Sequence, residues 1–253
     1  MHAPVAPPIP IKLLLQAYRS GVFPMADDRE DSEVFWVEPR ERAILPLDGF
    51  HCSRSLLKAL KQDRFTVTCD AAFGEVIRIC AAPRPDQPTS WISRRIEASY
   101  NALHAAGHAH SVECWRNGEL VGGLYGVAFD KVFCGESMYS HADNASKVAL
   151  AWLVAAMRRA GYRLLDCQFM TGHLGSLGAV PLPQADYVAL LAEARGKPLC
   201  SIPQAIAAFQ AEGAAGEAVA AGRAGSSASP SPSAGAEASS PGKLIAQSLT
   251  QTS

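Results

Sequence analysis

A nearly all-apolar helix is the feature that most constrains the fold of this chain. Residues 145–160 (ASKVALAWLVAAMRRA) have the length of a helix and carry apolar side chains on nearly every side, and Gly161 can end the helix. A helix that is apolar all round has to be buried inside the protein. Because the short apolar strand 162–169 follows at once, we expect the helix to lie beneath a β-sheet.

A meander of strands precedes this helix. The Asn117-Gly118 pair is the strongest short signal for a hairpin, and it separates two of the predicted strands. Strands are predicted at 35–37, 43–45, 65–68, 111–115, 120–127 and 132–136, and helices at 11–21, 53–61, 73–80 and 93–106. This mixture predicts an α+β fold.

The composition indicates a protein of a reducing compartment. The 253 residues include seven cysteines, an odd number without any CxxC pair, so neither a disulfide framework nor a zinc site is expected. The chain has no stretch of about 20 apolar residues that could span a membrane, and its N-terminus lacks the pattern of a signal peptide. We therefore expect a cytoplasmic protein. The formal net charge of −1 argues against general coating of nucleic acid but allows a local basic patch.

The C-terminal end of the chain has a different composition. From residue 211 onward Ala, Gly, Ser and Pro dominate, and large apolar side chains are almost absent before Leu244-Ile245. Such a segment cannot bury enough surface to offset the entropy that it loses on ordering. We therefore predict that residues 210–253 form a disordered tail with no catalytic role.

Three polar residues stand in apolar strands. Glu136 ends a strand in the run Phe-Cys-Gly-Glu-Ser-Met, where a carboxylate must be paired, hydrogen-bonded or neutral. Asp166 and Gln168 lie two residues apart on another strand, so their side chains should point to one face. Both sets leave two interpretations open, a structural network of buried polar groups or a site aimed at a ligand.

The histidines give weaker signals. His104 and His108 have the i, i+4 spacing of two metal ligands on one helix face, with His110 close by, but Gly107 breaks the helix between them. A helix C-terminus rich in histidine, which the helix dipole favours, is the better interpretation, so no metal site is predicted. His173 follows the Asp166 strand and is either an acid/base group or a loop residue.

A basic stripe lies on the second predicted helix. Arg54, Lys58 and Lys61 have helical spacing on the face opposite the leucines of that helix. Such a stripe is usually a solvated helix face, but beside an active cleft it could hold phosphates.

Several segments together resemble the leucyl/phenylalanyl-tRNA–protein transferase family. In chain order they are Ala17-Tyr-Arg-Ser-Gly-Val-Phe-Pro-Met25, Ser90-Trp-Ile-Ser-Arg94, Gly107-His-Ala-His-Ser-Val-Glu113, Leu120-Val-Gly-Gly-Leu-Tyr-Gly126, Phe133-Cys-Gly-Glu-Ser-Met138, Asn144-Ala-Ser-Lys147, Leu165-Asp-Cys-Gln168, and His173 with Ser176-Leu-Gly-Ala179. Each motif alone is weak, but so many in one order over residues 11–195 are specific.

The resemblance implies an aminoacyltransferase. Leucyl-tRNA or phenylalanyl-tRNA would be the donor, and a protein with an N-terminal Arg or Lys would be the acceptor, marked in this way for degradation by the N-degron pathway. An aminoacyl ester is already activated, so no cofactor, ATP or metal is implied. The resemblance also implies a small N-terminal domain (residues 1–40) and a GNAT-like acyltransferase domain (residues 41–209). A monomer is the default expectation.

The resemblance also suggests roles for the site residues. Asp166 would orient or deprotonate the attacking amine, directly or through Gln168, and Gln168 would donate to the ester carbonyl. Glu136 would shape the base of the amino-acid pocket or help to place the acceptor. Phe133 and Met138 would line that pocket, with ordinary core packing as the alternative.

Further substrate contacts follow from the matching motifs. Tyr18 and Trp91 would stand at the mouth of the site, where the terminal adenosine of the tRNA could stack. Ser140 and Asn144 would also bind substrate. The basic stripe of the second helix would grip the phosphates of the acceptor stem, through Arg54, Lys58 and Lys61.

Two other functions remain open at this point. One is a GNAT-like acetyltransferase that uses acetyl-CoA, although no Gly-rich pyrophosphate loop precedes a helix here. The other is a non-catalytic RNA-binding protein, which the net charge of −1 disfavours.

Overall fold

The fold is built around one mixed β-sheet. The computed structural model describes residues 6–83, 88–224 and 239–251. Its strands are β1 (Phe23–Met25), β2 (Phe35–Val37), β3 (Glu41–Ile44), β4 (Thr66–Cys69), β5 (Ala109–Arg116), β6 (Glu119–Phe129), β7 (Val132–Ser140), β8 (Leu164–Gln168) and β9 (Val180–Pro183). The main sheet has the order β4-β5-β6-β7-β8-β3-β9, and β1 and β2 pair separately. Strands β7 and β8 run parallel, whereas the other paired strands are antiparallel.

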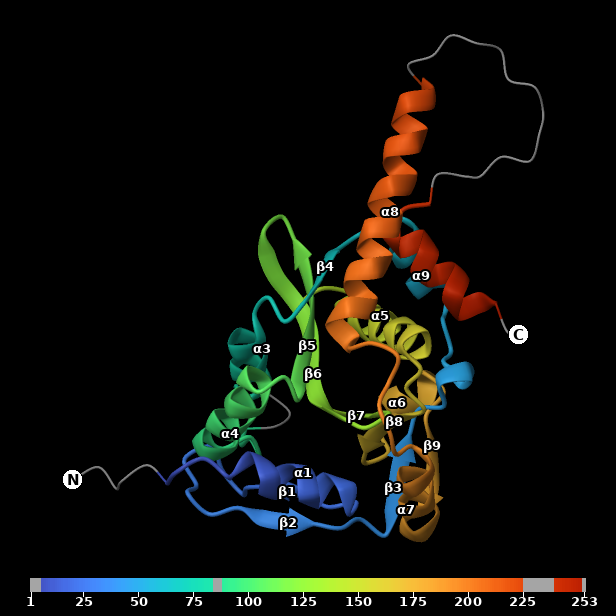
Figure 1. Cartoon of the computed structure of the whole chain (residues 1–253). Coiled ribbons are helices and arrows are strands. Elements are labelled where there is room, and N and C mark those ends of the chain that lie inside the picture. Colours follow the sequence, from blue (N-terminus) through green and yellow to red (C-terminus); the bar gives the residue numbers. More distant parts are fainter. Residues whose placement is uncertain (1–5, 84–87, 225–238, 252–253) are drawn as a thin grey trace.

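Helices cover both faces of this sheet (Figure 1). They are α1 (Ile11–Arg19), η1 (Leu47–Gly49), α2 (Arg54–Lys61), α3 (Phe73–Cys80), α4 (Arg94–Ala105), α5 (Ala145–Ala160), α6 (Gly172–Ser176), α7 (Gln184–Glu193), α8 (Ile202–Ala224) and α9 (Pro241–Thr250). One apolar core joins α2, α5, α8 and α9 to the sheet, and a second core joins α1, α3, α4 and α7 to its other side. The architecture is therefore α+β, as the sequence predicts.

Helix α5 is buried beneath the sheet, which confirms the expectation from its composition. Its side chains are buried almost without interruption from Ala145 to Met157, and the helix packs against β5, β6 and β7. Gly161 ends it in the left-handed conformation (φ 73°), where glycine has no steric penalty. The helix also connects β7 to β8, and this crossover allows the two strands to run parallel.

A β-bulge interrupts the pairing of β6 with β7. Gly126 lies opposite Gly135 and Tyr125 lies opposite Ser137, so Glu136 is the extra residue. A bulge reverses the alternation of side chains beyond it and bends the strand. Strands β7 and β8 pair only from Val132↔Leu164 to Cys134↔Asp166 and are unpaired beyond that point.

The described part of the C-terminal segment is helical, which corrects the prediction of a disordered tail from residue 210. Residues 211–224 continue α8, because alanine is the strongest helix former. In α9, Ile245, Ala246 and Leu249 are buried against the core formed with α2 and α5. The rest of the predicted tail, residues 225–238 and 252–253, lies outside the described residues. None of the helices in the described residues combines the length and the hydropathy that a bilayer crossing requires.

Candidate active site

A cavity of about 350 Å³ opens where β7 and β8 separate. Its inner wall is apolar and comes from the sheet, α5 and α6, through Leu124, Met138, Leu150, Leu153, Leu165 and Leu174. Polar side chains stand along the remaining wall, namely Glu136, Ser137, Gln168, Thr171 and His173, and the aromatic rings of Trp91, Tyr125 and Phe169 also line the cavity. An apolar cavity with a few convergent polar groups is the usual form of a small-ligand site.

Glu136 is held in this cavity by two tyrosines. The bulge directs its carboxylate toward Tyr18 of α1 and Tyr100 of α4, whose hydroxyls donate over 2.7 and 3.1 Å. The two hydroxyls also contact each other. Burial raises the pKa of Glu136 to about 7, and the hydrogen bonds from the tyrosines oppose that rise. The carboxyl group therefore exchanges its proton near neutral pH.

Asp166 lies behind the cavity and does not line it. Its carboxylate is fully buried and receives both Nε and Nη2 of the equally buried Arg42, over 2.8 and 2.6 Å. Tyr187 donates its hydroxyl over 2.9 Å, and the backbone N–H of Gln168 donates over 2.8 Å. A carboxylate with four donors and a paired charge is a fixed anion, and it holds the backbone of Gln168 in place.

Gln168 faces the cavity, whereas Asp166 faces Arg42. The backbone of Gln168 is left-handed (φ 62°), which ends the regular strand at this residue. The amide of Gln168 is close enough to lower the pKa of Glu136. Its Nε2 is nevertheless buried without a hydrogen-bond partner among the described residues. A buried donor without a partner costs about 1–3 kcal/mol, so this amide is available to a ligand.

The other predicted pocket residues divide between cavity and core. Trp91 and Met138 line the cavity. Tyr18 is fully buried beneath it, which corrects the prediction that its ring stands at the mouth. Phe133 is also fully buried and packs in the core, which corrects its assignment to the pocket. The two residues are five positions apart on β7, and the bulge brings both side chains to one face of the sheet, where Phe133 packs in the core and only Met138 reaches the cavity.

A smaller polar hollow adjoins the cavity. It has a volume of about 280 Å³ and is lined by Ser140, Asn144, Lys147 and His173, among others. His173 lines both spaces. Partial burial and the nearby Lys147 lower the pKa of His173.

The remaining predicted groups lie outside the cavity. Arg54, Lys58 and Lys61 are exposed along α2, as their spacing predicts. His110 is bound to Asp70 over 2.7 Å, and the ring of His104 stacks on another aromatic ring, that of Phe73. In the described part of the chain, no group of three or more His, Cys, Asp or Glu residues could hold a metal ion.

Sequence reasoning missed the groups that surround the two carboxylates. Arg42 lies 124 positions from Asp166, and Tyr100 and Tyr187 come from separate helices. No local spacing connects them. The only available signal was that a buried Asp requires a cationic or hydrogen-bonding partner.

Two models of one protein family match most of this chain. The family model described as leucyl/phenylalanyl-tRNA protein transferase matches residues 44–192, and the model of the corresponding N-terminal domain matches residues 9–40. A leucyl/phenylalanyl-tRNA–protein transferase of Novosphingobium aromaticivorans is 58% identical over 256 residues, which cover 97% of each chain. The protein of the same name from Rhizorhabdus wittichii is 61% identical over 184 residues, covering 73% of this chain and 74% of the relative.

Solved structures are more distant. A functionally unknown conserved protein from Staphylococcus epidermidis aligns with a TM-score of 0.37 at 12% identity, covering 69% of this chain and 65% of the other. This likeness is too low to carry an argument about the fold.

Proposed function

The chain belongs to the leucyl/phenylalanyl-tRNA–protein transferase family, and we propose that the cavity between β7 and β8 is the site of its transfer reaction. The protein moves leucine or phenylalanine from aminoacyl-tRNA to the N-terminal Arg or Lys of acceptor proteins, which marks them for degradation by the N-degron pathway. The observation that carries the proposed site is the buried amide of Gln168, which lines the cavity beside Glu136 and whose Nε2 has no hydrogen bond of ordinary geometry among the described residues.

The apolar wall is the proposed pocket for the amino-acid side chain of the donor. Leucines from α5, α6 and the sheet suit both a branched aliphatic and an aromatic group, and Met138 adapts to either shape. Trp91 lines the same cavity and is partly exposed, which supports the proposal that its ring stacks on the terminal adenosine. Ser140 and Asn144 would bind the donor from the adjoining polar hollow.

Gln168 is the proposed donor to the reacting carbonyl. When the acceptor nitrogen attacks the ester carbon, the carbonyl oxygen gains negative charge, and an amide already in place stabilises it without reorganisation. Asp166 acts as a positioning residue, because its carboxylate is fully occupied and binds the backbone N–H of Gln168. We therefore favour action through Gln168 over direct deprotonation by Asp166.

Glu136 is the proposed acceptor of the amine proton. The α-ammonium of an N-terminus has a pKa near 8, so it must lose a proton before it can attack. A carboxylate with a pKa of about 7 at the cavity wall is well matched to take that proton. The nitrogen then bonds to the carbonyl carbon, and the bond from that carbon to the ribose oxygen breaks. The second proton that the nitrogen loses passes to the ribose oxygen, so the tRNA leaves with a hydroxyl. The ester supplies the driving force, so the proposal requires neither ATP nor a metal.

We further propose a small N-terminal domain of residues 1–40 and a GNAT-like catalytic domain of residues 41–209. The separate β1–β2 pair and the start of the main sheet at Glu41 support the first boundary. The parallel β7–α5–β8 unit with its open end supports the second assignment.

Transfer of labelled leucine tests the proposed site. Pure protein is mixed with radiolabelled Leu-tRNA and a protein that starts with Arg, and the label on the acceptor is counted. Gln168→Glu removes the amide donor at nearly constant shape, and we expect kcat to fall by roughly 100-fold or more. Gln16→Glu makes the same change on the exposed face of α1 and serves as the matched control. Equal turnover of the two variants would remove Gln168 from the site.

A further inference from the structure

Four cationic side chains gather where three distant segments of the chain meet. The backbone N–H of Lys131 donates to Ala194 over 3.0 Å, and the N–H of Arg163 donates to the carbonyl of Lys131 over 2.8 Å. Gly196 lies against the Lys131 side chain, since a Cβ on that glycine would be 4.0 Å from Lys131 Cε. The hydrogen bonds therefore fix a cluster that we call the basic corner, which consists of Lys131, Arg163, Arg195 and Lys197.

The charge of the basic corner is not neutralised within the described residues. Arg163, Arg195 and Lys197 are exposed and Lys131 is half-buried, and none of the four has a carboxylate within ion-pair distance in the described part of the chain. Of the two acidic neighbours in sequence, Asp130 is already paired with Arg19 over 3.0 Å. When the negative charge of the other acidic neighbour, Glu193, is set against the four cations, three positive charges remain in excess at the basic corner. The whole chain has a net charge of −1, so this excess is a local feature.

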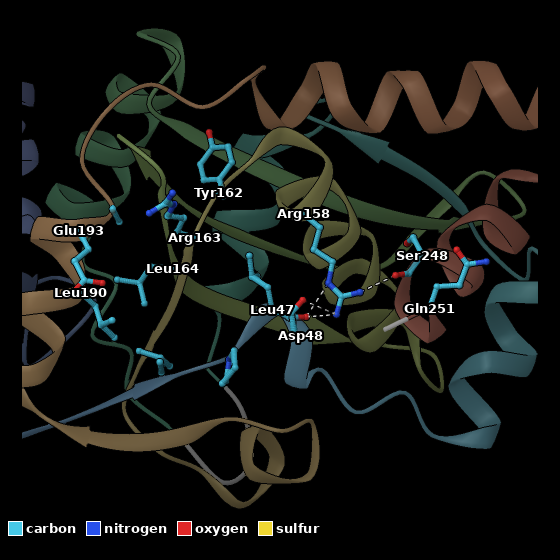
Figure 2. A pocket seen from close by; sticks show the side chains of 13 residues that line it. Leu47, Asp48, Arg158, Tyr162, Arg163, Leu164, Leu190, Glu193, Ser248 and Gln251 are labelled. Atoms are coloured by element: carbon cyan, nitrogen blue, oxygen red, sulfur yellow. Dashed lines mark hydrogen bonds and ion pairs between the residues drawn. The ribbon is translucent and has the colours of Figure 1, made fainter. Parts of the chain in front are cut away.

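A hollow of about 870 Å³ extends away from the basic corner. Figure 2 shows Arg163 and Glu193 at one end, Arg158 in the middle, and Ser248 of α9 together with Gln251, which follows α9, at the other end. Arg158 does not contribute a free charge, because it donates to the carbonyls of Leu47 and Ser248 and is paired with Asp48. The hollow is thus an open surface depression, and the arginine in its middle is held by its hydrogen bonds and ion pair.

Helix α9 links this hollow to the end of α2. The C-terminal end of α9 lines the hollow, and the N-H of Gly242 at its other end donates over 2.8 Å to Asp63, which follows α2. Ten helical residues span roughly 15 Å. The basic corner and α2 therefore lie at opposite ends of the hollow and α9.

We infer that the basic corner binds backbone phosphates in the body of the donor tRNA. The corner lies beside Leu164, where β8 begins, whereas the cavity reaches Gln168, where it ends. Four residues of strand place the corner roughly 13 Å from Gln168, and Leu165, which lines the cavity next to Leu164, points to the opposite face of the sheet. The corner therefore stands apart from the groups that react in the cavity. Exposed Lys and Arg side chains without carboxylate partners are suited to phosphates and carry no base specificity.

A tRNA fits this surface better than an acceptor protein does. Every tRNA presents the same regular phosphate charge, whereas acceptor proteins share only their N-terminal residue. A fixed excess of positive charge is therefore of use with every donor but with only some acceptors. The inference rests on the proposed function, because it takes aminoacyl-tRNA as the donor.

The test compares two donors on one triple variant, Arg163→Ala/Arg195→Ala/Lys197→Ala. Leucyl-tRNA has a body, whereas leucyl-adenosine carries the same ester without one. We expect the KM for leucyl-tRNA to rise on the order of tenfold at 0.15 M salt, and the salt dependence of tRNA binding to lose a slope of about 0.7–0.9 for each phosphate contact removed. Turnover of leucyl-adenosine should stay unchanged. The control removes three exposed cations elsewhere, Lys12, Arg78 and Arg116, and should leave both donors unaffected.

Several outcomes would overturn the inference and leave the proposed function intact. An unchanged KM and salt slope for leucyl-tRNA would mean that the corner is a solvated surface. A rise in KM for the acceptor protein alone would assign the corner to that partner. If the control variant raised the KM for leucyl-tRNA equally, the effect would come from the net charge of the protein and not from the corner. If the triple variant lost activity equally with leucyl-tRNA and leucyl-adenosine, the effect would lie in the cavity. Failure of the wild-type protein to use either donor would instead contradict the proposed function.

Discussion

Two polar regions lie back to back in this protein, and they satisfy their buried groups in opposite ways. Behind the cavity, the carboxylate of Asp166 has four donors, and Arg42 neutralises its charge. Arg42 is itself enclosed between the rings of Phe23 and Tyr187, 4.7 and 4.5 Å from their centroids. This region, the Arg42–Asp166 pair, has no capacity left for a ligand.

The region that faces the cavity is incomplete. Gln168 has a buried amide nitrogen without a partner among the described residues, and the pKa of Glu136 is raised to about 7 by burial. Buried polar groups whose hydrogen bonds are all satisfied stabilise the fold. Buried polar groups without a partner carry an energetic penalty, which a bound substrate can remove by supplying the partner. The Arg42–Asp166 pair is therefore a structural support, and the proposed chemistry falls to Glu136 and Gln168.

The largest effect on stability should come from breaking the Arg42–Asp166 pair. Arg42→Met leaves the carboxylate of Asp166 buried without its cation, and we expect the free energy of unfolding to fall by about 3–5 kcal/mol in urea titrations. Arg40→Met alters an exposed arginine two residues away and should change stability by less than about 0.5 kcal/mol. The double variant Arg42→Met/Asp166→Leu leaves no unpaired charge and should recover much of the loss. If the double variant is as unstable as the sum of the two single variants, the pair is not a coupled unit.

How much of these regions the sequence could predict depends on how far apart their parts lie in the chain. Helix α5 and the hairpin at Asn117-Gly118 were predictable, because periodicity and turn chemistry act over a few residues. Glu136 and Gln168 could be recognised as polar residues in apolar strands. Their geometry depends on the bulge at Glu136 and on the left-handed backbone of Gln168, and no local sequence pattern predicts either feature. Arg42 and Tyr100 come from elements far along the chain, so only the folded structure could supply them.

The next largest expected effect is on stability, depends on pH, and concerns Glu136, which faces the cavity. The pKa of Glu136 is about 7 in the folded protein against an ordinary value of 4.5, so the folded state binds the extra proton more strongly. The stability that this proton gives is complete below about pH 4.5 and is lost as the pH rises toward 7, to a total of about 3 kcal/mol. Glu136→Gln cannot ionise, and its stability relative to the wild type should rise over the same window.

Urea titrations of both proteins between pH 4.5 and 7.5 measure that difference directly. Glu119→Gln, an exposed glutamate at the start of β6, is the matched control and should show no such window. A constant difference between Glu136→Gln and the wild type across the range would mean that Glu136 ionises at an ordinary pH.

The smallest effect separates the two tyrosines that hold Glu136. A hydrogen bond to the ionised carboxylate lowers its pKa, so removing either hydroxyl should raise the pKa further, by roughly one unit. Tyr18 donates over 2.7 Å and Tyr100 over 3.1 Å, and the Tyr18 bond is the stronger of the two in lowering the pKa. Tyr18→Phe should therefore shift the titration of the Glu136 carboxyl carbon, followed by NMR, more than Tyr100→Phe does. Tyr125→Phe removes a neighbouring buried hydroxyl that has no partner among the described residues, and should leave the titration in place. The reverse order of the two shifts would mean that α4, not α1, controls the charge state of the cavity.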